Sequence, residues 1–269
     1  MARPFEGLAG ETEWVAIREI LPAATGRITL TGDAAPDSLG EATIASVLPM
    51  AWAGLHRDTG EVLVGTQSGG ASGDASRDLV SQLLATASLE PGLPLQVVPQ
   101  PTVETPRLQD LVDQSAPFRA EVHEGFDFWT AEAELEDAAK ESLERANESA
   151  VPTVRLGDDS AFWCRIGDRT YVRIVLPEDE DVATNALARL HAAQQDDFGD
   201  GTRLLGAFRA CGLLVPVIEL DAEAEPASYV EPLEQWRNRY ATAAANQDSL
   251  TADERRAKSG LLSRQVTLR

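Results

Sequence analysis

The stretch AFWCRIGDRTYVRIVL, at positions 161–176, decides the fold class of this chain. Phe162, Cys164 and Ile166 occupy every second position, which is the period-two pattern of a half-buried strand. Gly167-Asp168 supplies turn residues, and a second apolar run follows at 170–176. The pattern therefore predicts a β-hairpin.

The residues around this hairpin extend it into a larger unit. A short strand is predicted before it, at 153–156, and the acidic run 178–181 begins a helix that continues to about 195. We expect a shorter helix at 202–210, because Gly212 is a suitable residue to follow its C-terminus. An apolar strand at 213–220 completes the unit.

The first half of the chain shows a similar order. A helix at 12–21 and strands at 27–31 and 42–48 precede a second predicted hairpin, 50–55 with 61–66, which turns at positions 57–60. Asp74 then caps a helix that reaches about 88, and a strand follows at 95–98. We therefore predict an α+β fold with two α/β units, each with a hairpin, a helix and a strand. A divergent duplication of 42–98 and 153–220 and two independent units are both open.

Prolines divide the two halves. Six prolines lie between positions 91 and 117, and proline removes backbone donors and disfavours helix in the residue before it. An acidic helix with a narrow apolar stripe is predicted at 130–149, and two C-terminal helices at 229–245 and 251–262, the last with a Thr251–Glu254 capping box. The expected organisation has four parts. They are an N-terminal α/β unit at 1–98, a Pro-rich connection at 99–120, a second α/β unit at 121–220 and a helical segment with a basic tail at 221–269.

Charge excludes some functions. The chain has 269 residues with 44 Asp and Glu against 23 Lys and Arg, a net charge of −21. Broad nucleic-acid binding by this acidic body and docking on an anionic membrane both need the opposite sign. No apolar run approaches the ~20 residues of a membrane span, and two cysteines form no disulfide framework. We therefore expect a soluble cytoplasmic protein.

The acidity is not uniform along the chain. Residues 1–120 carry a net charge of −8 and residues 121–250 one of −16, whereas residues 251–269 carry +3. This basic tail either folds back on the acidic body or binds an external acidic partner, such as RNA, another protein or a second copy of this chain. The candidate partner-binding residues are Arg255, Arg256, Lys258, Arg264 and Arg269.

Catalytic and metal-binding motifs are weak. The Gly/Ser loop 68–73 lacks the Lys-Ser/Thr of a phosphate-binding P-loop, so a simple connection is the better interpretation. Cys164, His191 and Cys211 are zinc-type ligands, but their spacing matches no compact zinc motif. The acid clusters at 178–181 and 196–200 are typical of solvated faces and caps, with weak cation binding as the alternative. No catalytic residue, metal ligand or cofactor is assigned.

Several phrases resemble a known family. They are RPFEGL at 3–8, EWVAIRE at 13–19, PAAT at 22–25, SGD at 72–74, the segment 203–217 and the ending SRQVTLR at 263–269. Together they resemble an actinobacterial protein family of unknown function over nearly the whole chain. Longer members carry an N-terminal SEC-C-like zinc motif, which accounts for labels such as SecA-like or topoisomerase-like. That motif is absent here, so the resemblance implies neither zinc nor translocation, and it supplies no catalytic residues.

The leading hypothesis is a non-enzymatic binding or adaptor protein. The first alternative is an enzyme that uses carboxylates or a divalent cation in a cleft between the units, with Asp179, Asp181, Arg173 and Trp163 in its lining. The second alternative is an acidic mimic of nucleic acid.

Overall fold

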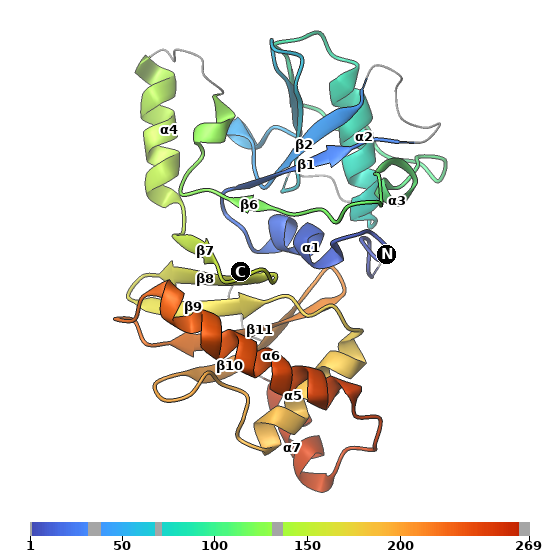
Figure 1. Cartoon of the computed structure of the whole chain (residues 1–269). Helices are drawn as coiled ribbons and strands as arrows, with labels where there is room; N and C mark the ends of the chain where they lie inside the picture. The colour runs from blue at the N-terminus through green and yellow to red at the C-terminus, as the bar shows by residue number, and fades with distance from the viewer. Residues whose placement is uncertain (1, 32–38, 68–71, 131–136, 264–269) are drawn as a thin grey trace. The chain divides into compact units, whose positions relative to one another are not determined.

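The structure is a computed structural model, which describes residues 2–31, 39–67, 72–130 and 137–263. The chain divides into two compact units, residues 1–150 and residues 151–269, and each is described by itself. Both units combine helices with a sheet, so the predicted α+β class is confirmed (Figure 1).

Unit 1 is built on a six-stranded mixed sheet with the order β5-β3-β4-β2-β1-β6. Its strands are β1 Ala24–Thr29, β2 Glu41–Ala45, β3 Gly54–His56, β4 Val62–Gly65, β5 Pro94–Leu95 and β6 Glu121–Val122. Its helices are α1 Glu11–Glu19, α2 Ala75–Ala87, α3 Leu108–Leu111 and α4 Asp137–Ser149, with short 3-10 turns η1 Pro49–Ala51 and η2 Asp127–Trp129. The β2–β4 pair is parallel, and the other pairs of this sheet are antiparallel.

One face of this sheet packs against α2. Gly54, Val64 and Ile44 are neighbours across β3, β4 and β2, so their side-chain positions lie on the same face. A Cβ atom at Gly54 would lie 1.9 Å from Thr86 Oγ1 of α2, which shows how closely strand and helix approach. This face is the main apolar side of the sheet. The row Arg27, Thr43 and Leu63 therefore lies on the opposite face.

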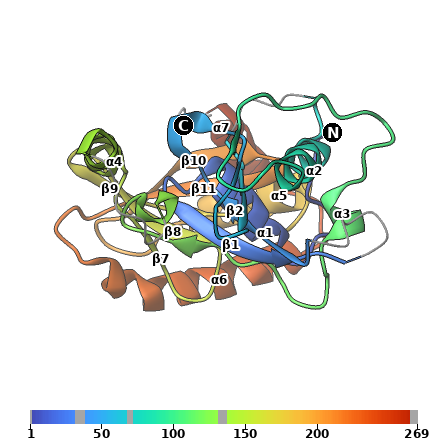
Figure 2. The same ribbon diagram turned by 90° about the horizontal axis from the view of Figure 1, so that it is seen from above.

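Aromatic stacking completes the core of unit 1. The Trp14 ring of α1 stacks on Phe118 at a centroid distance of 4.1 Å and on Phe5 at 5.9 Å. All three side chains are buried. Both views place α4 at the periphery of this unit, and its described side chains are mostly exposed (Figures 1 and 2).

Unit 2 is built on a five-stranded antiparallel sheet with the order β10-β11-β9-β8-β7. Its strands are β7 Thr153–Arg155, β8 Ala161–Ile166, β9 Arg169–Ile174, β10 Arg203–Ala210 and β11 Leu213–Leu220. Its helices are α5 Glu180–Ala192, α6 Val230–Ala245 and α7 Ala252–Ser263, with a 3-10 turn η3 at Pro226–Tyr229.

The core of unit 2 lies between the sheet and its helices. Trp163 and Ile174 on one face of the sheet share a buried cluster with Leu187 of α5, Trp236 of α6 and Leu261 of α7. The Trp236 and Tyr240 rings stack at 5.2 Å. A second, smaller cluster of Cys164, Tyr171 and Val217 occupies the other face, as the two-residue period requires.

Both predicted hairpins are present. The 161–176 hairpin is β8–β9, and the earlier one is β3–β4, in which Gly60 takes a φ of 86° that favours glycine. Asp74 caps α2 by accepting a hydrogen bond from the Ser76 backbone N–H at 3.2 Å. The Thr251–Glu254 capping box also forms at the start of α7. Of the predicted acidic helix, 137–149 forms α4, and 131–136 lie outside the described residues.

The predicted helix at 202–210 is wrong, because this segment is strand β10. Cys211 and Gly212, with φ of 46° and 86°, form a two-residue turn with positive φ at both positions, which folds β10 onto β11 as a hairpin. The glycine that suggested a helix end is the second turn residue. Gly206, with φ of 155°, lies where the register shifts, so a bulge interrupts the apolar alternation that would have identified a strand.

The Pro-rich segment bears on the domain organisation, for which the expected four-part division stays a prediction. The Pro-rich segment contains no long helix, since α3 has four residues, but it packs inside unit 1. Leu108 and Leu111 are fully buried, and β6 pairs with β1. The units therefore divide after Ala150. Their sheets differ in connectivity, one mixed and one antiparallel, so the shared order of elements does not favour duplication.

Among the described residues, no helix has the length and apolar character that crossing a bilayer requires.

Candidate functional site

The candidate site lies on the face of the unit 1 sheet opposite α2. Arg27 of β1 pairs with Thr43 of β2, which pairs with Leu63 of β4, so the three side chains form a row across the sheet. Thr25 and Glu121 are partners on β1 and β6 and lie on the same face. This row is the floor of the site.

The β3–β4 hairpin supplies one wall through a network around Glu61. The Thr43 hydroxyl donates to Glu61 Oε1 at 2.8 Å, and Arg57 Nη1 donates to Glu61 Oε2 at 2.7 Å. The other guanidinium nitrogen of Arg57 donates to the backbone carbonyl of Phe128. Arg57 therefore uses its planar fork to connect the hairpin with the segment that contains η2.

These residues enclose a cavity of about 280 Å³, which we name the sheet groove. It is lined by Thr25, Gly26, Arg27, Thr43, Arg57, Glu61, Leu63, Arg119, Glu121 and Phe128. A second cavity of about 390 Å³ adjoins it, since both are lined by Arg27, Thr43 and Glu61. This space is of the size that binds small ligands.

The charge of the sheet groove contrasts with that of the chain. Three guanidinium groups and two carboxylates line it, whereas the whole protein has a net charge of −21. Glu61 neutralises Arg57. Arg27 is exposed, and none of the residues that the structure describes forms a hydrogen bond or ion pair with its side chain. Its guanidinium group is therefore available to pair with an anion from solution.

A hydroxyl–imidazole pair lies at the same place. Thr25 Oγ1 and His123 Nε2 are 2.7 Å apart, and the His123 backbone N–H donates to the Ala23 carbonyl at 2.9 Å. A nucleophile beside a base needs a third group to orient the base. Within the described ranges, no hydrogen-bond partner engages His123 Nδ1. The pair therefore places a hydroxyl and an imidazole where either can hydrogen-bond a ligand.

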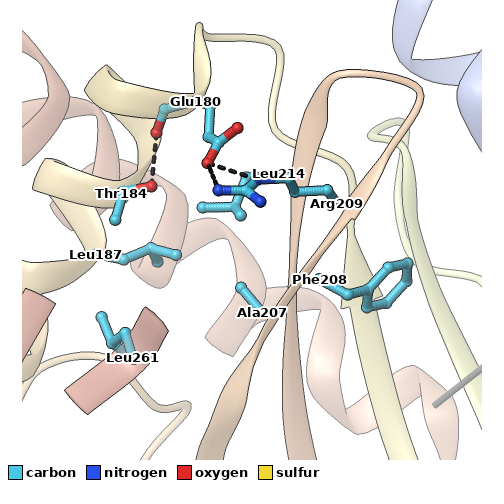
Figure 3. Close-up of a pocket in the computed structure, with 8 residues that line it drawn as sticks. All are labelled: Glu180, Thr184, Leu187, Ala207, Phe208, Arg209, Leu214 and Leu261. Carbon is cyan, nitrogen blue, oxygen red and sulfur yellow. Dashed lines mark hydrogen bonds and ion pairs between the residues drawn. The ribbon is translucent and has the colours of Figure 1, made fainter. Parts of the chain in front are cut away.

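A smaller cavity lies in unit 2 between α5, β10 and α7 (Figure 3). It has a volume of about 30 Å³, room for about two water molecules. Leu187, Leu214 and Leu261 make most of its lining apolar, and Glu180 accepts a hydrogen bond from Arg209 Nε at 2.6 Å at its rim. It is a gap in the packing.

The described basic residues of the tail contact their own unit. Lys258 Nζ donates to Asn185 Oδ1 at 2.9 Å and lies 3.7 Å from Asp181 Oδ1. Arg256 pairs with Asp253, and Arg255 donates to the Leu250 carbonyl. Arg264 and Arg269 lie outside the described residues. Binding of an external partner by these five residues stays a prediction.

The structure separates the three zinc-type residues. Cys164 is buried in the sheet, and burial raises the pKa of its thiol, an effect that nearby Arg173 opposes. His191 Nδ1 hydrogen-bonds Asp196 at 2.6 Å, and Cys211 lies in the β10–β11 turn. In the part of the chain that the structure describes, no group of three or more His, Cys, Asp or Glu could hold a metal ion.

The residues expected to line an enzymatic cleft do not lie together. Trp163 belongs to the helix-covered face of the unit 2 sheet, whereas Arg173 is on the opposite face. Asp179 and Asp181 lie at the start of α5. Most of the 68–73 loop, the other candidate for anion binding, lies outside the described residues.

A polar network in unit 2 perturbs two side chains. Tyr240 Oη donates to Glu178 Oε2 at 2.7 Å, and burial together with that carboxylate raises the pKa of Tyr240. Burial lowers the pKa of Arg237, although Asp159, whose Oδ2 lies 3.1 Å from Arg237 Nε, acts in the opposite direction. The network ties α6 to the segments before β8 and α5. It therefore stabilises the fold of unit 2.

Sequence reasoning missed the sheet groove because its residues are scattered. Its arginines occupy positions 27, 57 and 119, on β1, in a turn and before β6. Each lies apart from any other Arg or Lys in the sequence. The one available signal was Arg27 at the start of the predicted strand 27–31, at a position that alternation placed away from the core.

Comparison with known proteins assigns the chain to a family. Residues 4–269 match DUF5926, a family of unknown function, and the chain belongs to that family. No curated protein matches the chain, and no solved structure matches it.

Proposed function

We propose that unit 1 is a non-enzymatic binding module, and that the sheet groove holds a small anionic ligand. Arg27 forms the primary ion pair with this ligand, Arg119 provides a second positive charge, and the Thr25–His123 pair offers a hydrogen bond. This proposal keeps the binding-protein hypothesis from the sequence but assigns binding to unit 1 instead of the basic tail. We also propose a cytoplasmic location, which fits the absence of a disulfide between Cys164 and Cys211.

The observation that carries the proposal is Arg27, which lines a cavity of about 280 Å³ and whose side chain has no hydrogen-bond or ion-pair partner among the described residues. Arg57 is held by Glu61, but Arg27 projects from β1, next to the edge strand β6, with no such partner among the described residues. A guanidinium group in a concave site recognises carboxylate or phosphate through two parallel hydrogen bonds. The acidic remainder of the chain would repel an anion, so binding depends on these local bases.

Calorimetric titration with methyl phosphate and with acetate tests the proposal. A charge-assisted hydrogen bond contributes about 1.5–3 kcal/mol, so Arg27→Gln should weaken binding by roughly tenfold or more. Arg145→Gln is the matched control, because Arg145 is an exposed base on α4 of the same unit. Equal binding by the two variants, or no binding of either anion by the native protein, would reject the proposal.

A further inference from the structure

Phe128 forms an apolar wall of the sheet groove, and binding of a small anion would not require such a wall. Phe128 is half-buried and lines the cavity together with Leu63 of the floor. These two side chains give an otherwise polar groove one apolar side. An inorganic anion has no surface that would contact it favourably.

The Phe128 ring belongs to an aromatic cluster on the same face. Its centroid lies 5.2 Å from that of His123, 6.1 Å from Phe126 and 6.5 Å from Trp129, the last in an edge-on arrangement. Phe126 and Trp129 stack on each other at 4.6 Å. These contacts fix the position of the Phe128 ring, and its remaining exposed surface borders the cavity.

Hydrogen bonds hold the backbone of this segment. Arg57 donates to the Phe128 carbonyl, Trp129 Nε1 donates to the Val47 carbonyl at 3.0 Å, and the Phe126 N–H donates to Asn147 Oδ1 at 2.7 Å. The segment is therefore tied to the β3–β4 hairpin, to the residues after β2 and to α4. A wall held in this way is pre-organised, so a ligand that packs on it orders little protein on binding.

We infer that the ligand of the sheet groove is an aromatic anion, a compound in which a flat ring is joined to a phosphate or carboxylate. The anionic group pairs with Arg27, and the ring packs against Phe128, which itself covers the buried Leu63. The cavity of about 280 Å³ accommodates both parts. This inference rests on the proposed function and adds the chemical class of the ligand.

Matched phosphate monoesters test it by calorimetric titration of the full-length protein. Methyl phosphate and phenyl phosphate carry the same anionic group and differ in the ring. Stacking of a ring on an aromatic side chain favours phenyl phosphate by about tenfold in the native protein. Phe128→Leu keeps an apolar side chain but removes the ring, so this ratio should fall to about twofold or less while methyl phosphate binds as before.

Two further variants serve as controls. Phe128→Tyr retains the ring and should keep the native ratio, and Phe198→Leu changes a half-buried aromatic residue of unit 2 and should leave it unaltered. Adenosine monophosphate compared with ribose 5-phosphate then distinguishes a nucleotide from a simpler aryl phosphate. A native preference for the nucleotide that disappears in Phe128→Leu also supports the inference.

The outcomes separate this inference from the proposed function. If both monoesters bind equally in the native protein, and Arg27→Gln weakens both, the anion site stands and the aromatic inference is rejected. A phenyl preference that survives in Phe128→Leu rejects it as well. If neither monoester binds, the proposed function and the inference fail together.

Discussion

Replacing Gly54 by alanine should destabilise unit 1 by crowding β3 against α2. An added Cβ would lie 1.9 Å from Thr86 Oγ1 and 2.9 Å from two carbon atoms of the same side chain. Ordinary van der Waals contact begins near 3.4 Å, so strand and helix would have to separate by about 1.5 Å or Thr86 would have to change rotamer. Thr86 is completely buried, which leaves it no free volume.

The magnitude follows from this crowding. Overpacking of a closely packed core costs about 1–3 kcal/mol of unfolding free energy. With a urea m-value of about 2 kcal/mol per molar, the midpoint of unfolding should fall by roughly 0.5–1.5 M. Gly40→Ala is the control, since its Cβ would meet no atom within 4 Å, and it should change the free energy by at most about 0.5 kcal/mol.

A double-mutant cycle tests the mechanism. Thr86→Ala alone removes the hydrogen bond from its hydroxyl to the Gln82 carbonyl and one buried methyl group, a loss of about 1–2 kcal/mol. In the Gly54→Ala/Thr86→Ala protein the new methyl group occupies the vacated space, so the combined loss should be smaller than the sum by about 1 kcal/mol or more. Additive losses, or a Gly54→Ala midpoint within error of the native one, would refute this account of the β3–α2 contact.

Other regions of the fold give predictions of their own. The Thr251 backbone N–H, which donates to Glu254 Oε2, lowers the pKa of Glu254, so this stabilisation is present above the pKa of an unfolded glutamate and is lost as the pH falls through the lower folded value; urea midpoints of Glu254→Gln should therefore vary less with pH than native ones. Gly260→Ala should raise the unfolding free energy by about 0.5–1 kcal/mol, because Gly260 lies inside α7 with nothing within 4 Å of its Cβ position, and equal or lower stability in urea would contradict this. Cys211 should react with Ellman's reagent well before Cys164, because burial covers the Cys164 thiol and raises its pKa; a fast phase that persists in Cys211→Ser would show the opposite order.

Local signals in the sequence predicted much of the fold. The 161–176 hairpin and strand 213–220 follow from the alternation or continuity of apolar residues, which reports burial of a strand directly. Asp74 and Thr251 cap helices through contacts within three residues, so their geometry is encoded nearby. Each of these features depends on neighbours in the chain.

Segment 202–210 shows where such reasoning fails. Leu204, Leu205 and Phe208 have the spacing of a helical stripe, and the intrinsic preference for a helix is weak enough for tertiary contacts to override it. The deciding element is the Cys211-Gly212 turn, whose positive φ angles bring β10 beside β11. The sequence alone does not show that β11 pairs with β9 and leaves its other edge for β10. A glycine at position 212 is therefore equally compatible with a hairpin turn and with the end of a helix.

The sheet groove could not be predicted from the sequence for another reason, and that reason also bears on its function. The pairing of the strands brings together positions that are far apart in the sequence, namely 27, 57, 61, 119 and 128. Strand β1 pairs with both β2 and β6, and β2 pairs in parallel with β4, the second strand of the β3–β4 hairpin.

Net charge directed attention to the basic tail, yet the described bases of α7 already contact acceptors in their own unit. Arg27 is different, since the fold brings Glu61 to Arg57 and leaves Arg27 exposed beside a cavity. Glu41 on β2 and Glu121 on β6 stand on the two strands adjacent to Arg27 and on its face of the sheet, yet among the described residues neither forms an ion pair with it. The residue directly opposite Arg27 is the uncharged Thr43, so an external anion is the partner that we propose for it.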